Sequence, residues 1–436
     1  MDERLTSEEL RDCWPILSAS ERIEAFQHMA RADSDDFFLG IAAADQADIL
    51  VAMPEGERRL WLRLLAPDDA ADVVQRVSPE QRAALLATLD EPTRREVVAL
   101  LAYAEDAAGG LMSPRFARLR PEMSVAEAIR YLQRQAQERL ETIYYAYVLD
   151  QEQRLRGVVS FRELFTAPGE KQVSEVMRAD VISVPDTMDQ ESVARVIAQH
   201  DLNALPVVDA AGRMKGIVTV DDIVDVVQRE ATEDIQKLGG MESLDTPYLQ
   251  TPMVDMVRKR AGWLSALFLG ELLTASAMGR FEDEIAKAVV LALFVPLIIS
   301  SGGNSGSQAT TLIIRAMALG EVKLGDWWRI MRRELMAGLF LGLILAALGT
   351  VRILVWQQIF HTYGEHSGQV AATVAVSLVG IVTWGTLAGS MLPFVIRRLG
   401  FDPASASAPF VATLVDVSGL VIYFTVAQII LRGTLL

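Results

Sequence analysis

The stretch Pro409–Gly419, PFVATLVDVSG, lies inside an apolar segment near the C-terminus of this 436-residue chain. The segment 406–431 is long enough to cross a bilayer as a helix, and Asp416 is its single acidic residue. A charge at membrane depth is costly, so such a residue usually faces a water-filled path or a partner. A protonated Asp416 bonded to neighbouring backbone is the alternative. We interpret Asp416 as part of a cation site.

The composition separates an acidic part from an apolar part. Hydrophobic residues make up 51% of the sequence, too many for an ordinary soluble protein. Of the 57 acidic residues only ten lie from Ala261 onward, against eleven of the 41 basic residues. The first 260 residues therefore hold 57−10=47 acidic and 41−11=30 basic residues, a net charge of −17, which disfavours nucleic acid as their partner. No signal-peptide pattern opens the sequence, so we expect this acidic part to be cytosolic.

The first hundred residues are predicted to form a small helical solenoid. Prolines recur every 12 or 13 residues, at Pro54, Pro67, Pro79 and Pro92, each followed by polar residues and then an apolar run. Proline fits the first turn of a helix, where its missing N–H is not needed, and Ser78 is a plausible helix cap. The region 1–108 therefore reads as an all-α helical-repeat domain.

An internal repeat follows. Tyr147–Asp150 and Gly157–Ser160 match Pro206–Asp209 and Gly216–Thr219, with the same step from Asp to Gly. Apolar runs of four bounded by such turn signals predict buried strands, so each half should run helix, strand, turn, strand, helix. This pattern resembles a tandem pair of CBS domains, with α+β folds over 109–170 and 171–230.

An acidic segment comes after the second repeat. Spacings of three and four place Asp222, Asp225, Glu230 and Glu233 along one stripe of a helix. Like charges in this arrangement repel one another unless cations lie opposite, and a solvated charged face is the alternative. A connecting helix over 231–260 then leads into the apolar part.

Five apolar segments make up the region 261–436, at 261–279, 285–314, 334–358, 370–396 and 406–431. We expect the second to be interrupted by Pro296 and by the Gly-rich run Ser300–Gln308, as a pore wall or as a site of close helix packing. Lys and Arg are more numerous at the ends that join the acidic part, which predicts a cytosolic N-terminal part and an external C-terminus.

Over nearly its whole length, the chain resembles the MgtE family of Mg²⁺ channels. The motifs that carry the resemblance are Val295-Pro296, Ser301–Ala316, Leu392–Phe394, Asp402-Pro403 and Pro409–Asp416. The resemblance implies a homodimer in the bilayer of the inner membrane, in which Asp416 and the carbonyl of Ala412 recognise a hydrated Mg²⁺. Mg²⁺ gives up its water reluctantly, and a few carboxylate and carbonyl oxygens suit it.

The resemblance also implies a sensor that closes the pore when cytosolic Mg²⁺ binds. The matching positions are Asp189, Glu191, Ala198, Asp201, Asp222, Asp225, Glu230, Glu233 and Asp234, with Asp68, Asp72 and Asp402 in addition. Thr219 and Asp222 match the region where CBS domains contact the ribose of an adenine nucleotide such as ATP. The chain departs from the family's pattern at two positions. Ala408 stands where related sequences often have Asn, and Arg115 stands where they often have an acidic residue.

The leading hypothesis is therefore a multidomain membrane protein that imports Mg²⁺. A coupled carrier of Mg²⁺ or Co²⁺ is an alternative, although Glu271 is the only other carboxylate well inside a span. A nucleotide-sensing receptor without transport is another. An enzyme is not expected, because the spans supply no evident nucleophile, base or set of metal ligands.

Overall fold

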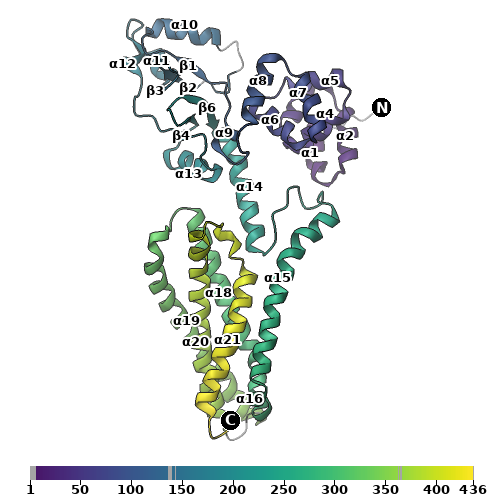
Figure 1. Cartoon of the computed structure of the whole chain (residues 1–436), viewed down its shortest axis with the longest axis vertical. Coiled ribbons are helices and arrows are strands. Elements are labelled where there is room, and N and C mark those ends of the chain that lie inside the picture. The colour runs from purple at the N-terminus through teal and green to yellow at the C-terminus, as the bar shows by residue number, and fades with distance from the viewer. Residues whose placement is uncertain (1–5, 136–139, 143, 362, 364–365, 436) are drawn as a thin grey trace. The chain divides into compact units, whose positions relative to one another are not determined.

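The computed structural model describes residues 6–135, 140–142, 144–361, 363 and 366–435 (Figure 1). The chain divides into two compact units, residues 1–230 and residues 231–436. Helix α14 contains the division between them.

The first unit begins with a helical domain. Its elements are α1 (Ser7–Cys13), η1 (Trp14–Ile16), α2 (Ala19–Gln27), α3 (Arg31–Leu39), α4 (Ala43–Ala52), α5 (Glu55–Leu62), α6 (Pro67–Arg76), α7 (Pro79–Thr88) and α8 (Glu91–Leu100). As predicted, Pro67, Pro79 and Pro92 lie in first turns, and Ser78 caps α7 by accepting the N–H of Gln81. Pro54 differs, since it occupies the cap position of α5 instead of the first turn.

Two similar small sheets follow the helical domain. Their elements are α9 (Ala108–Leu111), β1 (Ala117–Leu119), α10 (Val125–Gln135), β2 (Tyr145–Leu149), β3 (Leu155–Ser160), α11 (Phe161–Thr166), α12 (Val173–Val176), β4 (Val184–Pro185), α13 (Gln190–His200), β5 (Ala204–Val208), β6 (Met214–Thr219) and α14 (Val220–Leu238). Each sheet pairs its first strand parallel and its last strand antiparallel to the middle one.

The register confirms the repeat read from the sequence. Gly157 lies opposite Val148 in the first sheet, Gly216 lies opposite Val207 in the second, and a β-bulge follows each pair. A Cβ at Gly216 would come within 2.7 Å of the carbonyl oxygen of Ser113, so only glycine fits there. The second sheet shares a buried core with the helical domain, which fixes α6 against it.

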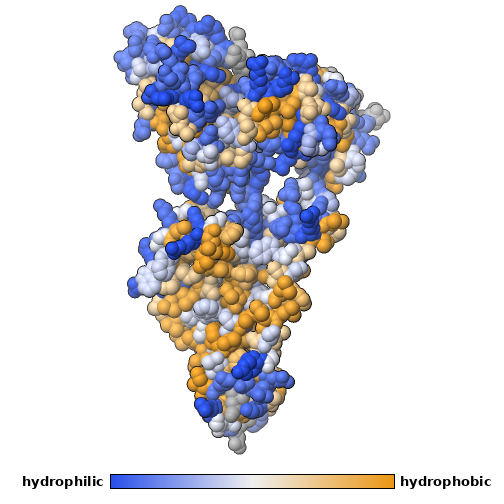
Figure 2. All heavy atoms as spheres, in the orientation of Figure 1, coloured by the Kyte–Doolittle hydropathy of each residue, from blue (hydrophilic) through white to orange (hydrophobic). Residues whose placement is uncertain are grey.

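The second unit is a bundle of long helices. Its elements are α15 (Met253–Arg280), α16 (Glu282–Lys287), α17 (Val289–Ala292), α18 (Val295–Ala318), η2 (Leu324–Asp326), α19 (Trp327–Phe360), α20 (Ser367–Arg398), η4 (Pro403–Ser405) and α21 (Ala408–Leu431). Within the described residues, five helices are long and apolar enough to cross a bilayer. Figure 2 shows hydrophobic atoms exposed along this unit, as expected of a surface that faces lipid.

The Gly-rich run of the second apolar segment does not interrupt its helix, contrary to our expectation. Pro296 lies in the first turn of α18, and the helix continues through Ser300–Gln308 to Ala318. Small residues there allow close packing, because a Cβ at Gly389 of α20 would come within 2.2 Å of the carbonyl oxygen of Gly306. The expected close helix packing is therefore present, and a pore wall formed by another face of α18 stays a prediction.

Candidate ion sites

Asp416 lies in the first half of α21, where this helix packs against a glycine of α18. A Cβ on Gly303 would lie 3.6 Å from Oδ1 of Asp416 and 3.4 Å from the Cβ of Ala412, one turn earlier. Among the described residues, the carboxylate of Asp416 takes part in no hydrogen bond or ion pair. The carboxylate is half-buried, has no hydrogen-bond partner among the described residues, and faces the backbone of α18 at Gly303. Its oxygens are therefore available to a hydrated cation.

A polar stripe runs along α18 on the face that other helices of the unit leave exposed. Its members recur at helical spacing and are Ser300, Asn304, Ser307, Gln308 and Thr311. Ser307 donates to the carbonyl oxygen of Ala408 at 3.2 Å, so the stripe reaches the start of α21. Exposed polar side chains within a span require water or a partner opposite them.

Among the described residues, Glu271 of α15 is a charged group close enough to Asp416 to interact with its carboxylate electrostatically. The two helices pack closely nearby, because a Cβ on Gly270 would lie 2.7 Å from Cγ2 of Thr413. The sequence showed Glu271 within a span but gave no sign of this proximity, which depends on the packing of the first and last spans.

In the first unit, Asp68 and Asp222 come together as members of an acidic cluster. Asp68 is only 7% exposed, and its buried Oδ1 has no hydrogen-bond partner. Burial raises the pKa of Asp68 well above its usual value, and the charges of Glu141 and Asp222 raise it further. Such a carboxylate is unfavourable when charged, and a bound cation would relieve the repulsion.

Asp222 lies in the first turn of α14 and accepts a 2.5 Å hydrogen bond from the hydroxyl of Thr219. Burial and then the charges of nearby carboxylates raise the pKa of Asp222, the hydrogen bond from Thr219 lowers it, and the net result is a pKa of about 7. Thr219 is itself buried, and its hydroxyl is engaged by Asp222.

Glu141 belongs to the same cluster, although sequence reasoning missed it. The hydroxyl of Ser113 donates to Glu141 at 3.0 Å. Burial raises the pKa of Glu141 too, and Asp69 and Asp221 are among the neighbouring charges that add to this rise. Glu141 lies between α10 and β2, in a segment without periodicity, so no sequence pattern could have identified it.

Asp72 lies one turn after Asp68, in a second acidic environment. Burial and the Glu105 carboxylate raise the pKa of Asp72, Arg229 opposes this rise, and the net result is a pKa of about 6. A pocket of about 250 Å³ nearby is lined by Glu105, Asp106, Gln190 and Arg229.

The remaining predicted sensor residues have local partners or lie on helix surfaces. Asp189 caps α13 by accepting the N–H of Ser192 at 3.1 Å, and Glu191 pairs with Arg195 at 3.0 Å. Asp201 ends α13 in the left-handed conformation, with φ of 50°.

Ala198 lies in the last turn of α13, where backbone carbonyls lack helical partners. Glu230 accepts from Gln190 at 2.6 Å, and Asp225 and Asp234 lie on α14.

In the second unit, a lysine stands beside two of the predicted metal positions. Lys237 of α14 forms ion pairs with Glu233 and, at 2.6 Å, with Asp402. Asp402 also caps the turn η4 by accepting the N–H of Ala404 at 2.9 Å. The ammonium group therefore already supplies a positive charge at this place.

Arg115 points to the helical domain. Its guanidinium binds Glu96 at 2.9 Å and Thr93 at 3.1 Å. The side chain at this position is therefore a cation that pairs within the helical domain, and it supplies no carboxylate to the predicted sensor.

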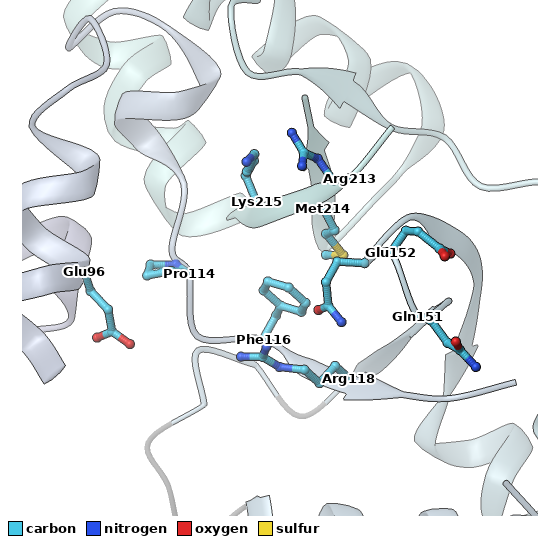
Figure 3. Close-up of a pocket in the computed structure, with 10 residues that line it drawn as sticks. Glu96, Pro114, Phe116, Arg118, Gln151, Glu152, Arg213, Met214 and Lys215 are labelled. Carbon is cyan, nitrogen blue, oxygen red and sulfur yellow. The ribbon is translucent and has the colours of Figure 1, made fainter. Parts of the chain in front are cut away.

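A pocket of about 480 Å³ lies at the turns of the two hairpins (Figure 3). Phe116 and Met214 lie at its centre, with Arg118, Arg213 and Lys215 around them. Thr219 and Asp222 do not line it. The predicted nucleotide contacts therefore lie away from this opening.

None of these carboxylates is arranged as a closed cage. Among the described residues, no three acidic, histidine or cysteine side chains are close enough to hold a bare metal ion. The arrangement instead suits a cation that keeps part of its water shell and is held through that water.

Comparison with known proteins gives consistent matches along the chain. Residues 295–426 match the family model MgtE, described as a divalent cation transporter, and residues 5–106 match the MgtE intracellular N domain. Residues 108–170 and 173–229 match the CBS domain.

Two relatives are each named magnesium transporter MgtE. The one from Thermus thermophilus is 41% identical over 99% of this chain and 94% of its own length. The one from Enterococcus faecalis is 35% identical over 77% of this chain and 72% of its own. A solved structure of the cytosolic domain of the Mg²⁺ channel MgtE in complex with ATP is 40% identical, with a TM-score of 0.47 over 51% of this chain and 91% of that one.

Proposed function

Because the chain belongs to the MgtE family, we propose that it transports Mg²⁺ across the cytoplasmic membrane as a homodimeric channel that cytosolic Mg²⁺ closes. The observation that carries this proposal is Asp416, a carboxylate within a span that lies against Gly303 and has no partner among the described residues. The relatives that match 99% and 77% of this chain are named as transporters and not as enzymes.

The polar stripe of α18 supports the dimer. Asn304 and Gln308 are exposed in a single chain, and within a bilayer such side chains need a polar surface opposite them. A second copy related by a two-fold axis would place two stripes and two Asp416 carboxylates around one path. Two carboxylates are enough for an ion that keeps several waters.

Transport is tested with the purified full-length protein in liposomes that contain a Mg²⁺ indicator. We expect Asp416→Asn to abolish Mg²⁺ uptake, because it keeps the size of the side chain and removes its charge. Glu271→Gln is the matched control, since it neutralises the other carboxylate well inside a span. Normal uptake by Asp416→Asn would remove Asp416 from the path.

The proximity of Glu271 to Asp416 favours one second candidate, a proton-coupled carrier. A carrier needs a group that exchanges protons, and Glu271 is a carboxylate near the proposed ion site. In a proton-coupled carrier, a pH gradient drives Mg²⁺ uptake, and Glu271→Gln would stop that uptake. In a channel, the same variant conducts, and the rate follows the Mg²⁺ gradient alone.

The acidic cluster of Asp68, Glu141 and Asp222 supports the sensor. Their charges repel in a partly buried place, and Mg²⁺ bound there would stabilise the packing of α6 against the second CBS domain. A ligand shifts an equilibrium only by binding one state better, so this site must favour the closed channel. The experiment is Mg²⁺ flux at rising internal Mg²⁺, where Asp222→Asn should conduct but need more Mg²⁺ to close.

ATP remains a predicted ligand of the CBS pair. The surroundings of Asp222 favour a cation over a triphosphate, because Asp221 and Glu141 lie nearby. Calorimetry with ATP tests this point: Thr219→Val should weaken ATP binding if Thr219 contacts the ribose. Unchanged binding would move the nucleotide elsewhere in the pair.

A further inference from the structure

Five arginines gather at one end of the helical bundle in the second unit. Arg329, Arg332 and Arg333 lie in the first two turns of α19, and Arg397 and Arg398 end α20. Ile330 shares a buried cluster with Phe394, so the two helix ends lie side by side. All five arginines are exposed.

Among the described residues these arginines form no ion pair, and Glu334, next to Arg333, is a neighbouring acidic charge that acts on one of them. In the described part of the chain, none of the five guanidinium groups forms an ion pair or a side-chain hydrogen bond. The acidic residue before them, Asp326, instead accepts the N–H of Lys323 at 3.0 Å. Even with Glu334 counted, the patch keeps a net positive charge, and its complement is an anion.

Two tryptophans stand at the edge of the same patch. Trp327 is 48% exposed and Trp328 is 54% exposed, with their rings edge to face at 5.6 Å. Neither indole N–H has an acceptor among the described residues. Tryptophan with an exposed ring and a free N–H is typical of the level of the lipid headgroups.

The position of the arginines along α19 also agrees with the level of the lipid headgroups. From Leu335 to Val351, α19 has no charged residue, a length of about 26 Å at the usual helical rise. A bilayer core is about 30 Å thick, so the arginines before Leu335 lie at its boundary with the headgroups. A soluble anion would have no need of the adjoining tryptophans.

We propose that Trp327, Trp328 and the five arginines bind the headgroup of an anionic phospholipid. The guanidinium groups pair with its phosphate, and the indole N–H groups donate to its ester or phosphate oxygens. The usual excess of basic residues on the cytosolic side explains the presence of arginines, but it requires neither their grouping on two packed helices nor the exposed tryptophan pair.

The test uses the full-length protein in phosphatidylcholine vesicles with brominated phosphatidylglycerol or brominated phosphatidylcholine. Quenching by bromine reports lipid contact, and subtracting the signal of Trp327→Phe/Trp328→Phe isolates these two rings. We expect phosphatidylglycerol to associate at least about tenfold more strongly than phosphatidylcholine, as several nearby positive charges predict.

Three variants decide the outcome. Arg329→Gln/Arg332→Gln/Arg333→Gln should lose the preference, whereas the triple lysine variant at the same positions should insert equally and retain most of it. Arg258→Gln/Arg260→Gln, which removes two exposed arginines from α15, should leave it unchanged. Equal quenching by both lipids, an unchanged preference in the glutamine triple, or loss in the lysine triple would overturn the proposal. So would loss of the preference when inorganic phosphate is added, which would indicate a site for soluble anions.

Discussion

At Asp68, a carboxylate is buried beside two others, and one of its oxygens has no hydrogen-bond partner. We expect Asp68→Asn to stabilise the metal-free protein, because an amide has no charge and can donate to a neighbouring carboxylate. The melting temperature in EDTA should rise by roughly 2–4 °C, the shift that about 1 kcal/mol gives in a unit of this size.

The same variant should respond less to Mg²⁺, with at most half of the thermal shift of the unsubstituted protein. Glu57→Gln is the control, since Glu57 is an exposed residue of the same helical domain. An equal Mg²⁺ shift in Asp68→Asn and in the unsubstituted protein would show that Asp68 binds no metal.

The acidic residues of the first unit also predict a pH dependence. Folding raises the pKa of Asp72 from 3.8 to about 6 and that of Asp222 from 3.8 to about 7. At a pH between the unfolded and the folded pKa, the folded state binds more protons than the unfolded state. The free energy of unfolding therefore falls as pH rises from about 4 to 7. The melting temperature in EDTA should therefore fall across this window and level off above it.

Saturating Mg²⁺ should flatten that pH dependence at its upper end, because the metal replaces the proton as the neutralising charge. Melting curves at matched ionic strength measure this effect. A melting temperature in EDTA that rises from pH 5 to pH 7 would contradict the burial of these carboxylates.

Single residues differ in how far the sequence reveals them. Asp416 could be predicted because a carboxylate stands out in an apolar segment. Glu141 and Glu271 lie beside the two candidate sites through neighbours distant in sequence, which no local pattern encodes. The partner of Asp402 was missed for the same reason, since Lys237 lies 165 residues away.

At the level of helices, α18 and α20 depend on contacts between glycines. A Cβ at Gly389 would meet the carbonyl oxygen of Gly306 at 2.2 Å, so Gly389→Ala must push the two helices apart. We expect a loss of about 1–3 kcal/mol, the usual cost of overpacking, read as lower thermal stability in detergent.

Gly380→Ala is the matched control in the same helix. The nearest atom to its Cβ would be Cγ2 of Ile422 at 3.4 Å, an ordinary contact. This variant should melt at or slightly above the temperature of the unsubstituted protein, because alanine favours a helix. Equal melting of the two variants would mean that α18 and α20 do not pack as described.

These glycines also show why the break expected at the Gly-rich run was wrong, whereas the break expected at Pro296 is present between α17 and α18. Within one segment, a run of Gly and Ser suggests irregular backbone, because glycine lowers helix propensity. In the bundle the same residues allow Gly302 and Gly385 to approach closely, and this packing keeps the helix regular. The strands of the repeat were predictable, in contrast, because Asp and Gly mark their turns locally.

For the whole molecule, the distribution of charge predicts the orientation in the membrane. In a background that carries Cys13→Ala, Thr434→Cys should react with an impermeant thiol reagent added outside cells. Gly325→Cys should react only after the membrane is opened; a Cβ there meets no atom within 4 Å, so the substitution is tolerated. The reverse pattern would place the acidic domains outside the cell.

The most direct test of the proposed function is electrical recording from the reconstituted protein with Mg²⁺ as the permeant cation and no pH gradient. We predict discrete current steps that vanish in Asp416→Asn, persist in Glu271→Gln, and close when Mg²⁺ is raised on the cytosolic side. Mg²⁺ uptake without any such current, driven by a pH gradient and abolished in Glu271→Gln, would contradict a channel and establish a coupled carrier.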